Sequence, residues 1–139
     1  CYEQIFGINI VGDSESNKLG MLDRHVYQEY GGHWVARRVS GVFAAKNKLV
    51  SANRLELTFP SGQVPQGITH QARLRWSDNK GLTYGNPMIK EIGTAGAGNQ
   101  RLVWWSMGSF RQRTYELSIS TAANRDLIDE DFQYEVGGL

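Results

Sequence analysis

Cysteine is almost absent from this sequence of 139 residues, in which Cys1 is the only cysteine. A lone thiol cannot close an intramolecular disulfide, which excludes a small secreted scaffold held together by disulfides and favours synthesis in a reducing cytosol. Long apolar runs are also absent: none approaches the roughly 18 residues of a membrane helix, and the start lacks the basic-then-apolar layout of a signal peptide. We therefore expect no membrane anchor.

Charge of one sign is not in excess either. Lys and Arg number 15 against 14 Asp and Glu, which gives a formal net charge of +1. A dedicated nucleic-acid-binding protein usually carries a strong basic excess. The composition therefore argues against that class, while it leaves room for a locally basic face.

Motifs for metal, phosphate or nucleophile chemistry are missing as well. His25, His33 and His70 have no partners at metal-ligand spacing, and we expect them at the surface or at strand edges. The Gly-rich segment 93–99 is not followed by the Lys-Ser or Lys-Thr of a phosphate loop, and Gly-x-Ser-x-Gly does not occur. A Ser-His-Asp triad assembles in space and stays open at this point, but the motifs predict no metal, no cofactor and no enzymatic activity.

What the sequence does contain is a series of short β-prone runs. Only three prolines and 16 glycines punctuate them, and no long stretch has helical periodicity. We expect an all-β chain whose main part is an antiparallel β-sandwich, because two packed sheets can bury its aromatic side chains. The predicted strands cover residues 5–11, 18–22, 25–30, 34–39, 51–59, 69–77, 88–92, 100–107, 113–120 and 132–136.

The alternation of side chains predicts how some of these strands pack. Leu55, Leu57 and Phe59 share one face of their strand. Residues 100–107 have large side chains on both faces, with Trp104 and Trp105 adjacent, so we expect this strand to be central in its sheet or covered by another element. The short connection 108–112 predicts that it pairs with residues 113–120 as a hairpin.

A Gly-Gly pair at residues 31–32 marks a boundary. The strands before it are too few for a core of their own. We therefore expect residues 1–31 to belong to a preceding domain or to linking strands, and residues 32–139 to form the sandwich. Because the chain has no initiator Met and enters an apolar run at once, we read it as the C-terminal piece of a longer polypeptide.

The most specific local motif follows the strand that ends at Trp76. Residues 77–84 match the Asp-box pattern Ser-x-Asp-x-Gly-x-Thr-aromatic, with Asn at the usual Asp position. Asn side chains bond backbone groups two residues on, and glycine accepts the positive φ of a bulged loop. The motif predicts a structural turn built by Ser77, Asn79, Gly81, Thr83 and Tyr84.

Two charged clusters are candidates for an interface. Arg111 and Arg113 flank the predicted hairpin turn, and an acidic cluster precedes the last strand, where its spacing is not that of a calcium loop. We expect the acidic cluster to form a solvated turn. Three surroundings stay open for these arginines: DNA phosphates, acidic residues of a neighbouring subunit, or solvent. The candidate acidic residues are Asp126, Asp129, Glu130 and Asp131.

Several of these segments together resemble one protein family. The Arg75-Trp76-Ser77-Asp78 hairpin is followed by a Gly-rich link, the strand at Trp104-Trp105, the Gly108 to Arg113 turn and Leu117-Ser118-Ile119-Ser120. In this order they resemble the C-terminal part of the packaged-DNA stabilisation proteins of short-tailed, P22-like bacteriophages, the tail hub or plug. Residues 9–23 resemble the family's Val-Gly-Asp, Lys-Leu and Leu-Asp segment, which implies that the N-terminal strands complete the last blade of a preceding β-propeller.

The resemblance implies a structural role in the virion tail, assembled in the bacterial host cytoplasm. Such proteins form a homo-oligomeric ring, a hexamer in this family, below the portal and adaptor proteins. They meet the tail needle and tailspike, contact packaged DNA non-specifically, and help to retain it in the head. A rival interpretation is a carbohydrate-binding or sialidase-like module, because Asp boxes also occur in glycan-handling propellers.

Overall fold

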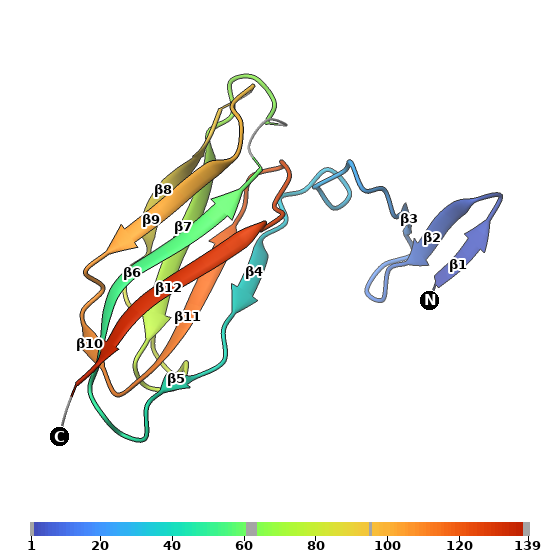
Figure 1. Cartoon of the computed structure of the whole chain (residues 1–139). Coiled ribbons are helices and arrows are strands. Elements are labelled where there is room, and N and C mark those ends of the chain that lie inside the picture. The colour runs from blue at the N-terminus through green and yellow to red at the C-terminus, as the bar shows by residue number, and fades with distance from the viewer. Residues whose placement is uncertain (1, 61–63, 95, 138–139) are drawn as a thin grey trace.

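The computed structural model describes residues 2–60, 64–94 and 96–137 (Figure 1). Cys1 and Ala95, which the sequence interpretation used, lie outside these ranges. The regular elements of the described residues are all strands, which confirms the all-β prediction. In chain order they are β1 (Tyr2–Ile5), β2 (Ile8–Gly12), β3 (Leu19–Met21), β4 (Ala36–Val39), β5 (Phe43–Ala44), β6 (Val50–Phe59), β7 (His70–Ser77), β8 (Met88–Gly93), β9 (Gln100–Trp105), β10 (Ser109–Phe110), β11 (Gln112–Ile119) and β12 (Asp129–Val136).

Two antiparallel sheets form the sandwich. In the first, β6 is central: β12 pairs along one side of it, and β9 and β10 share the other. The second has the order β4-β11-β7-β8, with β5 also pairing with β11. Figure 1 shows the two sheets stacked face to face. Strands β4 and β12 are therefore edge strands on one side of the sandwich, and β8 and β9 are edges on the other.

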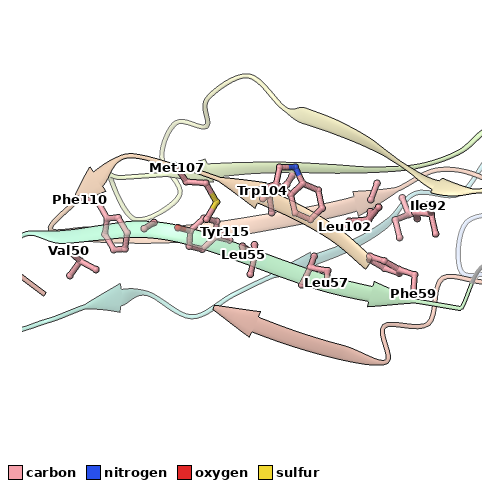
Figure 2. Packing of buried hydrophobic residues seen from close by; sticks show 14 residues of the cluster. Val50, Leu55, Leu57, Phe59, Ile92, Leu102, Trp104, Met107, Phe110 and Tyr115 are labelled. Carbon is pink, nitrogen blue, oxygen red and sulfur yellow. The ribbon is translucent and has the colours of Figure 1, made fainter. Parts of the chain in front are cut away.

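The core lies between the two sheets (Figure 2). Leu55, Leu57 and Phe59 all point into it from β6, as their alternation predicts. Trp104 and Ile92 reach it from β9 and β8 and are fully buried. The cluster also contains Val50, Ala52, Ala72, Leu74, Leu102, Met107, Phe110, Tyr115 and Ile119.

The prediction that residues 100–107 and 113–120 pair as a hairpin is wrong. Strand β9 pairs with β6, whereas β11 belongs to the other sheet. The segment between them follows β6, since Met107 N–H donates to the Ala52 carbonyl at 3.1 Å and Ala52 N–H to the Gly108 carbonyl at 3.0 Å, and then crosses between the sheets. Strand β9 thus forms its backbone hydrogen bonds with β6, although β11 is closer to it in the sequence.

The two neighbouring tryptophans also have different surroundings. Trp104 has an exposed fraction of 0%, but Trp105 on the outer face of β9 is 63% exposed. Strand β9 is an edge strand with an exposed outer face, so the expectation that it is central in its sheet or covered by another element is wrong.

The N-terminal residues form a separate three-stranded sheet of order β1-β2-β3. Residues 5–11 are not one strand as expected, because Phe6 and Gly7 turn the chain with φ values of 52° and 77°. Residues 25–30 form no strand and contribute only an isolated bridge between Glu29 and Gly32. No helix in the described ranges is long and apolar enough to cross a membrane.

Candidate functional site

The Asp-box turn is built by hydrogen bonds among the predicted residues. The Asn79 carboxamide oxygen accepts from Thr83 N–H at 2.9 Å and from the Ser77 hydroxyl at 2.7 Å. The Ser77 hydroxyl oxygen in turn accepts from Gly81 N–H at 2.8 Å, and Gly81 adopts a φ of 85°. Asn79 therefore fulfils the bonding role of the usual Asp. These polar groups thus satisfy one another within the turn.

The aromatic position of the box packs on a neighbouring strand. The Arg75 guanidinium lies 4.6 Å from the centroid of the Tyr84 ring, and its Nε donates to the Glu116 carboxylate at 2.7 Å. Glu116 is 3% exposed although its place on β11 predicts an outward side chain. The contact joins the turn to the middle of the five-stranded sheet.

Arg113 is buried and paired within its own chain. Its Nε and one terminal nitrogen donate to the Asp78 carboxylate at 2.6 and 2.8 Å, and the other donates to the Met107 carbonyl at 2.6 Å. The guanidinium also lies 4.4 Å from the Phe110 ring centroid and 5.0 Å from that of Trp76. Burial lowers the pKa of Arg113, but its interactions with Asp78 and Tyr115 together outweigh burial and raise the pKa. With an exposed fraction of 3%, Arg113 offers no surface to a partner in this arrangement.

Sequence reasoning missed the role of Asp78, which occupies a variable position of the Asp box. Its partner is 35 residues away, so no local spacing signals the pair. The acidic residue that pairs with Arg113, one of the two candidate interface arginines, thus comes from the Asp-box turn and not from the acidic cluster.

Arg111 is exposed, and one of its terminal nitrogens donates to the Asn47 carbonyl. It follows β10, which pairs with β6 at Val50 and Ser51, whereas Asp129 pairs with Thr58. Since a strand rises about 3.3 Å per residue, the two clusters are about 25 Å apart along β6. The structure therefore does not bring Arg111 and the acidic residues of the same chain together.

The acidic cluster is not a turn. Asp129, Glu130 and Asp131 are the first residues of β12, and only Asp126 precedes the strand. All four are exposed. Asp131 pairs with Arg54 on the neighbouring β6 at 3.2 Å. The prediction that this cluster ends before the last strand is wrong, because β6 provides ladder partners for its backbone.

A second feature that sequence reasoning missed is the outer face of β9, β6 and β12. Arg54 pairs with Glu56 and Asp131 and lies 5.4 Å from the Trp105 ring centroid. Arg101 reaches Glu56 from the other side at 3.4 Å. The face thus combines an exposed indole with a charge-paired row, and the period-2 pattern around Trp104 is the signal that places Trp105 outside.

One family model matches the chain. It is the bacteriophage P22 Gp10 β-sandwich, and the match covers residues 36–129. The chain belongs to the bacteriophage P22 Gp10 β-sandwich family. No curated protein sequence matches it.

Family membership makes the chain a structural part of a bacteriophage tail, located in the virion and assembled with other virion components. The Gp10 match begins at the first residue of β4 and extends to the first residue of β12. It therefore spans nearly all of the observed sandwich and none of the sheet β1-β2-β3.

One histidine of the Gp10 sandwich is buried, which contradicts the expectation that all three lie at the surface or at strand edges. His70 has an exposed fraction of 0%, and its Nε2 lies 3.0 Å from the Asn124 carbonyl. Its Nδ1 has no hydrogen-bond partner among the described residues. Burial lowers the pKa of His70 below 6.5, the bond to Asn124 opposes this, and the nearby Arg125 lowers the pKa further.

The lowered pKa of His70 predicts a pH-dependent stability of the Gp10 sandwich. Between the folded-state pKa and the unfolded value near 6.5, the unfolded chain binds the extra proton, so the unfolding free energy falls as the pH drops. One group contributes at most about 1.4 kcal/mol per pH unit. We expect His70→Gln to flatten the dependence as the pH falls through the unfolded value near 6.5, measured by denaturant unfolding.

His25→Gln is the matched control, because that imidazole is 90% exposed. This control is expected to keep the wild-type slope. Equal slopes in the His70 variant and the wild type would contradict the assignment.

The described residues contain no group of three or more His, Cys, Asp or Glu side chains placed to hold a metal ion. The polar side chains of the Asp-box turn are occupied by one another. What the Gp10 sandwich offers instead is surfaces: an exposed arginine at one end of β6, and acidic side chains at the other.

Proposed function

We propose that the chain is the C-terminal sandwich part of a tail hub that attaches below the portal and adaptor rings and helps to retain packaged DNA in the head. The Gp10 family match over residues 36–129 carries the proposal. The hub forms a homo-oligomeric ring, a hexamer in accordance with the family resemblance, and contacts the tail needle, the tailspike and, non-specifically, the packaged DNA. It assembles in the host cytoplasm and has no enzymatic activity.

The N-terminal sheet fits a role as the end of a preceding β-propeller within residues 1–31. Phe6 is 99% exposed and Leu19 75% exposed, and an isolated sheet of this size is marginal in water. A preceding propeller would cover such apolar side chains. Residues 32–139 then form the sandwich domain of the hub.

The positions of the two charged clusters favour head-to-tail contacts. A closed ring needs a heterologous interface, in which different patches of neighbouring copies meet. Arg111 and the acidic cluster lie at opposite ends of β6. We therefore propose that the Arg111 end of one copy meets the end of the next copy that contains Asp126 and Asp129. The alternative is that these ends contact a tail-fibre protein.

The test uses the intact gene product with its neighbouring tail proteins and DNA-filled heads. We expect Arg111→Glu to reduce attachment to heads and to increase DNA release, because the reversed charge repels the acidic cluster. Arg73→Glu is the control, since Arg73 is exposed on β7 and lies outside both clusters. Attachment of the Arg111 variant at the wild-type level would sink the interface, and heads that retain DNA without the protein would sink the function.

The carbohydrate-binding alternative has one feature in its favour, the exposed indole of Trp105. Aromatic faces stack on sugar rings, but Arg54 lies against this one. Binding of the purified chain to a glycan array, abolished by Trp105→Ala, would favour the alternative, whereas a ring of the full-length protein in electron micrographs would favour the hub.

A further inference from the structure

An apolar groove opens along one side of the sandwich, between the edge strands β4 and β12. Its volume is about 500 Å³, and its floor consists of inward side chains of both sheets, including Leu55, Leu57, Leu74 and Leu117. The rings of Phe43 and Phe132 meet across the groove, with their centroids 5.3 Å apart. Val39 and Phe43 beside it remain 49% and 41% exposed. The groove is thus a gap in the sandwich wall with an open strand edge on each rim.

The two rims carry opposite charges. Strand β4 has two arginines and no acidic residue, whereas β12 has four acidic residues and no basic one. Arg38 and Glu130 line the groove from opposite rims, and both are exposed. An edge strand exposes unpaired backbone groups that attract other strands, and charges on it decide which strands can approach.

We propose that this side of the sandwich pairs with a second copy of the chain, β12 of each copy lying beside β4 of the other. The arrangement is two-fold, with the axis along the strands. Rotation about such an axis exchanges the two layers, so each acidic edge meets a basic edge. A two-fold axis normal to the sheets would place acidic edge against acidic edge, and like charges repel at short range.

The same geometry brings one specific pair of side chains together. Rotation about an axis along the strands leaves the level of each residue along that axis unchanged. The rings of Tyr115 and Phe132 are in contact, with centroids 5.6 Å apart, which aligns β11 with β12. Arg38 opposes Leu117, two residues beyond Tyr115 on β11. Glu130 lies two residues before Phe132 on β12, so Arg38 and Glu130 lie at about the same level. Both also share the inward side of their strands, because they are register partners of Leu117 and Leu57. Arg38 of each copy therefore faces Glu130 of the other, twice per dimer.

The short length of β4, four residues, limits the contact area. An interface smaller than about 1,200 Å² is typical of weak association. The pairing therefore becomes populated only at high concentrations of the chain. It is an isologous contact, separate from the heterologous contacts proposed for the ring. It differs from the head-to-tail contact at Arg111, so the failure of one leaves the other intact.

The test uses the full 139-residue chain in sedimentation equilibrium over a wide concentration range. The wild type is expected to show a monomer–dimer equilibrium that weakens at high salt, because salt screens exposed charges. Arg38→Glu and Glu130→Arg, each alone, are expected to raise the dissociation constant roughly tenfold or more, since each reversal acts at both halves of the contact. Arg73→Glu is the matched control and is expected to dimerise like the wild type.

Mixing the two variants gives the decisive result. At the contact positions, the Arg38 variant has an acidic side chain on both rims and the Glu130 variant a basic side chain on both rims, so a heterodimer regains an Arg–Glu pair at each half of the contact. We expect the equimolar mixture to associate more tightly than either variant alone, with circular dichroism showing that both are folded. A wild type that stays monomeric, reversal variants that dimerise normally, or a mixture no tighter than its components would each overturn the pairing.

Discussion

Trp104→Ala is expected to destabilise the sandwich by about 3–5 kcal/mol. The Trp104 ring has an exposed fraction of 0% and lies in the middle of the core that the two sheets enclose (Figure 2). Truncation removes the transfer free energy of the indole and leaves a cavity that strands fixed by ladder hydrogen bonds cannot fill. Denaturant unfolding followed by circular dichroism measures the loss.

The adjacent residue supplies the control. Trp105→Ala removes the same side chain from a 63% exposed position on the same strand, so we expect a loss of less than about 1 kcal/mol. Trp104→Phe tests the polar part of the ring, because the indole N–H has no hydrogen-bond partner among the described residues. It should retain most of the stability. Equal losses for the two alanine variants would contradict the placement of the two rings.

The sequence predicts the parts of this fold that depend on local chemistry. Alternating side chains place Leu55, Leu57 and Phe59 in the core, because a strand turns successive side chains to opposite faces. The Asp-box pattern predicts the turn, because the hydrogen bonds of Asn79 and Gly81 are made to residues within the same short segment. Each of these predictions needs only neighbours in the chain.

The sequence fails where distant partners decide. Strand β9 pairs with β6 instead of β11, and Arg113 binds a carboxylate contributed by another strand end. The burial of His70 depends on the loop that contains Asn124, which is 54 residues away. In each case the local sequence is equally compatible with another structure: a hairpin for β9, a surface arginine for Arg113 and a surface imidazole for His70. Only tertiary packing distinguishes between them.

Asp78→Ala is expected to cost about 2–3 kcal/mol of unfolding free energy, although Asp78 itself is half exposed. The loss arises at Arg113, which is 3% exposed and, when the carboxylate is gone, keeps its hydrogen bond to the Met107 carbonyl but has no opposite charge to pair with. An unpaired buried charge costs more than the pair contributes. Because the side chain of Asp78 is 50% exposed, water partly replaces it, so the expected value lies below the range of about 3–5 kcal/mol for fully buried pairs. Thermal or denaturant unfolding measures it.

A second substitution separates the charge from the packing. Asp78→Ala combined with Arg113→Met replaces the cation by an apolar side chain among the rings of Trp76, Phe110 and Tyr115, and it should recover much of the loss because no unpaired charge remains. Asp126→Ala is the control for an exposed carboxylate and should change stability by less than about 0.5 kcal/mol. A loss in Asp78→Ala equal to that of this control would show that the pair is not needed. A clear difference would mean that the Asp-box turn stabilises the sandwich through Asp78, which ties the loop after β7 to the start of β11 and to the crossing segment at Met107.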